Sequence, residues 1–210
     1  MRNYGLFILS LVAGLSASTA EGLSAFGLPV TTQSQPAAAA SATGHSLPYN
    51  STIYVSTPIT LASLRRHYEQ AAADKTAGDK FYKLLAGYQE RDALVLAYKG
   101  AAEAIRARDA SMFNKLTYVQ DAARTFEQAV SIDPRNPEIR FLRFSVESNL
   151  PAFLGLSKHV DEDKEIVLKA AMAHPKSGLD SEAFQTVREF MVNRGHATPE
   201  QAQRLNKLAE

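Results

Sequence analysis

The chain contains no cysteine. This absence excludes a disulfide framework, a thiolate metal site, a cysteine nucleophile and a lipidated cysteine. An excess of one charge sign is also missing, because 23 basic residues face 22 acidic ones and the formal net charge is +1. Nucleic acids and anionic membranes attract a clustered basic surplus, so the overall charge predicts neither as a partner. The remaining composition, 45% hydrophobic and 21% charged among 210 residues, is that of an ordinary soluble globular chain.

Long hydrophobic runs are scarce, and the one that stands out lies near the N-terminus. Residues 1–20 hold a single charge, Arg2, and an apolar run from Gly5 to Leu15, followed by small residues that end at Ala20. This order is typical of a secretory signal peptide cleaved after Ala20. The run is shorter than the roughly 20 residues of a spanning helix, which argues against the alternative of an uncleaved anchor. The pattern predicts an exported protein, periplasmic or secreted, with no membrane span after cleavage.

Charged side chains are absent from Gly22 to Ile59, whereas residues 60–210 hold 22 basic and 21 acidic residues. Alanine, proline and small polar residues fill much of the uncharged segment, which therefore offers little apolar surface to bury. The abrupt change predicts a flexible linker over residues 21–59 and a folded domain over residues 60–210. A domain of that length buries about 68–70% of its unfolded surface, enough to fold without metal or disulfides.

The folded part shows helical periodicity throughout. Apolar residues recur at intervals of three and four, the spacing of one helical face. The stripes begin at Leu61, Phe81, Val95, Leu116, Ile139, Ile166, Phe184 and Ala202. Pro134, Pro137 and Pro151 mark helix boundaries, because proline suits a first helical turn and breaks a helix interior. The sequence predicts an all-α fold, a compact antiparallel bundle of about seven or eight helices.

One stretch, residues 122–137, has a more specific pattern. A small residue, an aromatic, an alanine and a proline follow one another at Ala122, Phe126, Ala129 and Pro134. This arrangement resembles the second helix of a tetratricopeptide repeat (TPR), in which alanines let two helices approach closely and the aromatic ring fills the gap between them.

The partner helix of this TPR-like hairpin can be placed in two registers. In one, Tyr98 and Gly100 belong to the partner helix, where the glycine allows close contact, and extra residues lengthen the turn. In the other, which needs no insertion, Ala110 and Phe113 are the small and aromatic residues.

The longer segment 98–175 is similar to uncharacterised exported bacterial proteins that carry a degenerate helical-repeat domain. The repeat period does not recur three times, as a solenoid requires. The resemblance therefore implies one TPR-like hairpin within a compact domain at the cell envelope, and it implies no established activity.

Motifs of catalysis and metal binding are missing from the sequence. No Gly-x-Ser-x-Gly turn or glycine-rich phosphate loop occurs, and no two of the five histidines have the spacing of a zinc motif. The run His159–Asp163 offers acidic groups to a divalent cation, but acids also favour the N-terminus of a helix, which is the preferred interpretation. We expect no enzyme activity, no cofactor and no metal.

Arg140 and Arg143 lie three residues apart beside Phe144. Guanidinium groups bind carboxylates in a bidentate manner, so these residues are candidates for contact with a peptide or protein partner. The alternative is that Arg143 pairs with Glu147 on the same helix while Arg140 covers apolar surface.

The sequence as a whole favours a non-catalytic exported module that mediates protein–protein interaction at the bacterial cell envelope. Two alternatives remain open. One is an envelope hydrolase with carboxylates remote in the chain; the other is a small-ligand carrier whose pocket is lined by Tyr98, Phe126, Phe141 and Phe144. A cleft with facing carboxylates would favour the hydrolase, a sizeable apolar cavity the carrier, and a shallow groove with an exposed apolar patch the interaction module.

Overall fold

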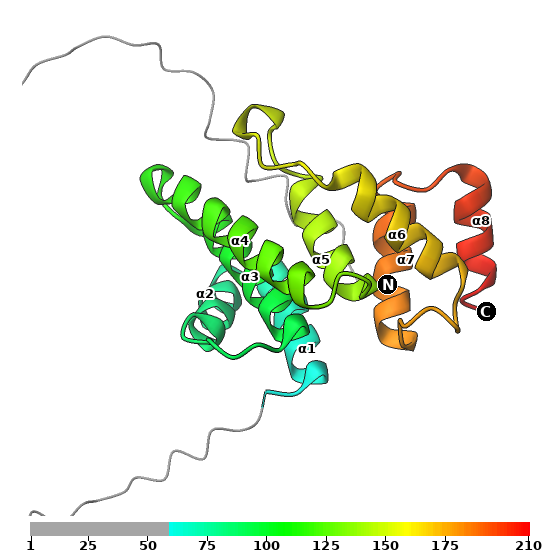
Figure 1. The fold of residues 1–210 in the computed structure, drawn as a ribbon, viewed down its shortest axis with the longest axis horizontal. Helices are drawn as coiled ribbons and strands as arrows, with labels where there is room; N and C mark the ends of the chain where they lie inside the picture. Colours follow the sequence, from blue (N-terminus) through cyan, green and yellow to red (C-terminus); the bar gives the residue numbers. More distant parts are fainter. Residues whose placement is uncertain (1–58) are drawn as a thin grey trace, which may run out of the picture. The chain divides into compact units, whose positions relative to one another are not determined.

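The computed structural model describes residues 59–210, so the predicted signal peptide and almost all of the predicted linker lie outside the described residues (Figure 1). The described part is all-helical, which confirms the predicted fold class. It consists of α1 (Leu61–Ala73), α2 (Lys75–Leu85), α3 (Ala93–Asp109), α4 (Met112–Ile132), α5 (Pro137–Glu147), the short 3-10 helix η3 (Ala152–Leu154), α6 (Val160–Met172), α7 (Ser181–Asn193) and α8 (Pro199–Lys207).

Side-chain caps fix where most of these helices begin. At six helix starts a Thr, Asp or Asn side chain accepts a hydrogen bond from a backbone N–H of the first turn, namely at Thr60, Asp74, Asp92, Asn136, Asp180 and Thr198. Thr198 and Gln201 form a complete capping box ahead of α8. Each such cap is worth about 1 kcal/mol, because it satisfies a donor that the helix itself leaves free.

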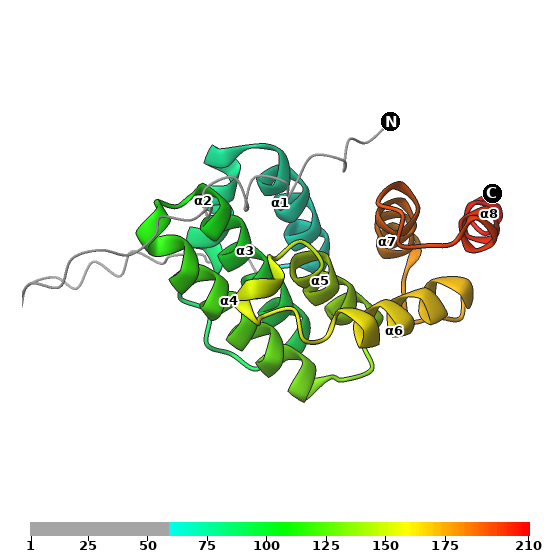
Figure 2. The ribbon, with the colours of Figure 1, turned by 90° about the horizontal axis from the view of Figure 1, so that it is seen from above.

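The helices form two groups on either side of α5. Helices α1 to α4 gather on one side, and α6, α7 and α8 follow on the other (Figures 1 and 2). The long helices α3 and α4 pack against each other as an antiparallel pair, and α5 contacts both of them as well as α6. All 11 residues of α5 are buried, so this short helix is the centre of the described fold.

The core contains four fully buried phenylalanines, each from a different helix: Phe81, Phe126, Phe144 and Phe184. Together with buried leucines and alanines they form one continuous cluster that extends from α1 to α8. A second, small cluster of Ala107 and Val119 lies where α3 ends and α4 begins. Among the helices of residues 59–210, none combines the length and the apolar character that crossing a bilayer requires.

Candidate functional site

The α3–α4 pair contains the residues of the TPR-like pattern. Gly100 lies directly against the Phe126 ring, and a Cβ atom added to Gly100 would come within 3.2 Å of ring carbons. Tyr98, Ala122 and Ala129 are also buried. A side chain at position 100 would therefore require the Phe126 ring to shift, because the two helices approach closely there.

This packing distinguishes between the two registers of the hairpin. Phe113 is 93% exposed, so it does not fill the space between the two helices as the register without an insertion requires. Gly100 of the other register is in contact with Phe126, whereas the Tyr98 ring packs against Tyr68 of α1 and its hydroxyl is bonded to α5. Pro134 follows α4, which ends at Ile132, and so lies outside the helix that it helps to terminate.

The structure places Arg140, Arg143 and Phe144 inside the fold rather than at a surface. Their exposed fractions are 6%, 3% and 0%. Arg143 donates to both oxygens of Asp163, with Nε–Oδ2 at 2.6 Å and Nη2–Oδ1 at 2.8 Å. Arg140 donates to the same carboxylate at 2.8 Å. These three side chains are not accessible to a partner, and the predicted role in partner binding does not fit their burial.

The expected pairing of Arg143 with Glu147 is also wrong. Glu147 instead accepts hydrogen bonds from the backbone and the ring of His159, at 2.8 and 2.9 Å. Asp163 lies in the first turn of α6, as predicted for an acid that favours a helix start, but its side chain turns inward to the two arginines of α5. The acidic run is thus a structural connection between α5 and α6.

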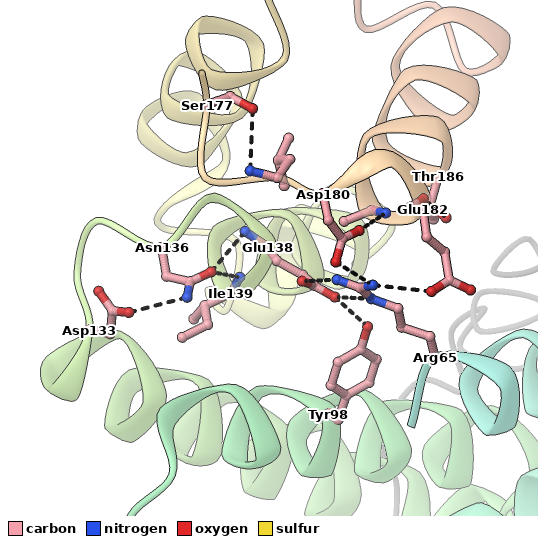
Figure 3. A network of polar contacts seen from close by, with 12 residues as sticks. Arg65, Tyr98, Asp133, Asn136, Glu138, Ile139, Ser177, Asp180, Glu182 and Thr186 are labelled. Atoms are coloured by element: carbon pink, nitrogen blue, oxygen red, sulfur yellow. Dashed lines mark hydrogen bonds and ion pairs between the residues drawn. The ribbon is translucent and has the colours of Figure 1, made fainter. Parts of the chain in front are cut away.

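A second buried network was not foreseen from the sequence (Figure 3). Arg65 of α1 forms a bidentate pair with Glu138 of α5, with distances of 2.9 and 2.7 Å. The Tyr98 hydroxyl of α3 donates to the same carboxylate at 2.7 Å. The remaining donor of Arg65 reaches Asp180 and Glu182 near the start of α7, at 2.8 and 3.1 Å. The network therefore connects four helices.

The electrostatics of this network follow from its pairing and its burial. The hydrogen bond to Glu138 raises the pKa of Arg65 above its ordinary value, in spite of the opposing effect of burial. Burial and the neighbouring Glu138 raise the pKa of the Tyr98 hydroxyl well above its usual range. Both groups therefore keep their protons at neutral pH, and the network is a charge-paired structural element.

A cavity beside this network is too small to hold a ligand. Its volume is about 20 Å³, and Tyr68, Tyr98 and Phe141 are among the residues that line it. This is room for about one water molecule. Phe126 and Phe144, which the carrier alternative places around a pocket, are instead packed in the core.

An open groove of about 440 Å³ lies at the end of the hairpin where α3 begins and α4 ends. Its walls are the loop before α3, the first turns of α3 and the last turns of α4. The lining residues are Tyr88, Gln89, Glu90, Arg91, Leu96, Lys99, Gln128, Ser131 and Ile132. The Lys99 ammonium donates to the Tyr88 carbonyl at 2.9 Å and so holds the loop against α3. The groove combines amides, charges and apolar side chains at the surface.

Glu103 is the one buried acid of the α3–α4 interface that retains an oxygen without a hydrogen-bond partner within the described residues. Burial raises the pKa of its carboxyl group, against the opposing effects of a hydrogen bond with Thr125 and of nearby Lys99.

Within residues 59–210, no group of three His, Asp or Glu side chains is arranged to hold a metal ion.

These features define the described part of the chain as an all-α helical scaffold with an open groove at one end of its longest hairpin. No family model, no curated protein and no solved structure matches the chain.

Proposed function

We propose that the chain is an exported, non-catalytic, TPR-like helical module that binds a segment of another protein at the bacterial cell envelope. The proposal rests on one observation, the open groove formed by α3, α4 and the loop before α3. Export follows from the signal-peptide pattern of residues 1–20.

The lining of the groove suits a polypeptide segment. Gln89 and Gln128 carry side-chain amides, which both donate and accept hydrogen bonds and so match peptide groups. Ile132 supplies apolar surface and is 38% exposed although it is a large aliphatic residue, whereas Leu96 also lines the groove but is buried. A mixed polar and apolar surface of this kind is typical of protein interfaces.

The two alternatives have less support. The carrier requires an apolar cavity, and the space beside Tyr98 and Phe141 has a volume of only about 20 Å³. The hydrolase requires an accessible reactive carboxylate, and Glu103, whose pKa is raised, is enclosed between α3 and α4. A shallow groove is the feature that favours an interaction module.

Site-specific photo-crosslinking tests the proposal. A photoreactive amino acid replaces Gln128 in the groove, and in a matched control it replaces Gln203, which is exposed on α8 and outside the groove. After exposure to envelope extract, we expect a discrete protein adduct from position 128 and none from position 203. Ile132→Ser should weaken this adduct, whereas Leu84→Ser, at an equally exposed leucine of α2, should not. Identical adduct patterns from both positions, or none from position 128, would contradict the proposal.

A further inference from the structure

The turn between α7 and α8 contains a histidine ring that lies among phenylalanines. His196 stacks on Phe190 of α7, with ring centroids 5.3 Å apart and planes 17° apart. It also meets the Phe144 ring of α5 in a T-shaped contact at 4.8 Å. Phe144 is fully buried, and Phe190 makes T-shaped contacts with it and with Phe141. The imidazole of His196 therefore attaches the α7–α8 turn to the aromatic core beside α5.

The surroundings of His196 favour an uncharged ring. The charged groups that act on it are Lys164 of α6 and Arg194 at the end of α7, and both are cations. No acidic side chain of the described residues, whether from α5, α6, α7 or α8, is among the groups that act on this ring. Burial, with smaller effects of the two cations, holds the pKa of the His196 imidazole below its ordinary value.

Helix α8 has few other attachments to the domain. It contacts α6 and α7 at the outer edge of the second group of helices (Figure 2), and of its nine residues only Leu205 is buried. The hydrogen bond from Arg188 of α7 to Asn206, at 2.9 Å, is exposed. The backbone N–H of His196 donates to the Met191 carbonyl at 2.9 Å, so the turn before α8 closes directly onto α7. The position of α8 therefore depends on Leu205 and on how this turn is seated.

We propose that His196 is a pH-sensitive contact: protonation of its ring in mildly acidic solution loosens the α7–α8 turn from α5 and releases α8 from the domain. A neutral imidazole packs against Phe144 and Phe190 as one more aromatic ring. An imidazolium requires water or an acid beside it, so the charged ring is favoured when the turn moves into solvent. Because this local opening exposes His196, uptake of the proton and release of α8 are linked. Release uncovers the apolar surface against which Leu205 is buried.

The direction of the effect follows from the lowered pKa of the seated ring. The stability that the neutral ring provides is fully present above the ordinary histidine pKa of about 6.5, and it is lost as the pH falls through the lower pKa of the seated ring. A difference of one between the two pKa values corresponds to an open population about tenfold larger in acid. Attraction of a cation to the face of Phe190 acts in the opposite direction, so the proposal requires that burial and the two cations outweigh it.

This inference goes beyond the proposed function and concerns a different part of the molecule. The groove is lined by α3, α4 and the loop before α3, and no residue of α7 or α8 contributes to it. Crosslinking from position 128 can therefore fail while the acid response of α8 persists, and the acid response can fail while crosslinking persists.

Titration by nuclear magnetic resonance tests the charge state of the ring in the chain that begins at Glu21, the predicted product of signal cleavage. His196→Phe identifies the His196 signals and keeps an aromatic ring in place. We expect a His196 pKa below the ordinary value of about 6.5. Lys164→Gln should raise this pKa because it removes a neighbouring cation, whereas Lys169→Gln, which removes a cation of the same helix that does not act on His196, should not. A His196 pKa at or above the ordinary value, or equal values in the two lysine variants, would overturn the inference.

Amide hydrogen exchange measures whether this titration releases α8. Exchange rates of residues 196–208 near pH 7.5 and near pH 5 are corrected for the chemical exchange rate at each pH and compared with those of α3. We expect the opening constant of α8 to rise in acid by the factor that the measured pKa difference sets, with α3 unchanged. His196→Phe should show no such rise, and Lys164→Gln should show a smaller one without altering the aromatic contacts. An α8 that opens no more in acid, or the same rise in His196→Phe, would overturn the inference.

Discussion

At the scale of single residues, the contact between Gly100 and Phe126 explains why α3 and α4 lie so close together. Glycine in a helix interior costs about 1 kcal/mol relative to alanine, so its presence needs a compensating gain. The gain is the space that the Phe126 ring occupies, since a Cβ at position 100 would lie 3.2 Å from ring carbons. Phe126 is itself 1% exposed, so a shift of its ring would disturb other core side chains.

Gly100→Ala should therefore destabilise the protein, by about 1–3 kcal/mol for an overpacked core. The same substitution in a Phe126→Ala background should instead stabilise it, because the clash is gone and alanine favours the helix. Phe126→Ala alone should cost about 3–5 kcal/mol. Urea unfolding of the four proteins measures this cycle. If Gly100→Ala has the same effect in both backgrounds, the two residues are not in contact.

The ionisation of Glu103 should make the free energy of unfolding depend on pH. Burial raises the pKa of its carboxyl group in the folded state above the unfolded value. The folded state therefore binds the proton more tightly, and the stability gained from protonation is fully present below the unfolded pKa and is lost as pH rises through the folded pKa. The neighbours that also act on this group are Thr125, Lys99, Asp121 and Arg124.

Glu103→Gln removes this titration and keeps the shape of the side chain. We expect the variant to be more stable than the wild type at pH 7, with a difference that shrinks as the pH is lowered toward 4. Thermal unfolding at a series of pH values measures the effect, with Glu165→Gln at an exposed position of α6 as the control. If Glu103→Gln is instead less stable than the wild type at pH 7, the ionised carboxylate stabilises the folded state there.

At the scale of the helices, α5 shows what a sequence does and does not reveal. The prolines at 134, 137 and 151 predicted its boundaries, because proline acts locally on the backbone. The sequence also predicted that the face with Ala122, Phe126 and Ala129 packs against a preceding helix, but it left two registers open for that helix. The inward direction of Arg140 and Arg143 was not predictable, because their common partner Asp163 is 23 and 20 residues away.

Two further features were not predictable because their residues lie far apart in the chain. Arg65 and Glu138 are 73 residues apart in the chain, and no local pattern connects them. The groove also combines the loop around Gln89 with Gln128 on α4, which come together only when the helices pack. Local periodicity thus predicts elements and their contact faces, whereas sites assembled from distant segments require the fold.

The α5–α6 connection should depend on one carboxylate. Asp163→Asn leaves Arg140 and Arg143 buried without the charge that pairs with both, and breaking a buried pair costs about 3–5 kcal/mol. Glu162→Gln removes a 55% exposed partner of Arg140 and should cost no more than about 1 kcal/mol. Urea midpoints of the two variants provide the comparison. Equal midpoints would mean that the arginines do not require Asp163.

At the scale of the whole described domain, the two groups of helices should unfold together. The first group, α1 to α4, contacts α5 through α3 and α4, and the second group contacts α5 through α6. Arg65 adds a direct connection from α1 to the start of α7. Because both groups bury α5, neither group can separate from this helix without exposing core surface.

The positions of the tyrosines allow this joint unfolding of the two groups to be measured. Within residues 59–210 the tyrosines are Tyr68, Tyr82, Tyr88, Tyr98 and Tyr118, all in α1 to α4 or the loop between them, and the chain has no tryptophan. Tyrosine fluorescence of a fragment spanning 59–210 therefore reports on the first group, while far-ultraviolet circular dichroism reports on every helix. Urea unfolding followed by both signals should give a helical spectrum and one coincident transition. Two separated transitions, or a spectrum dominated by sheet, would contradict a self-sufficient bundle built around α5.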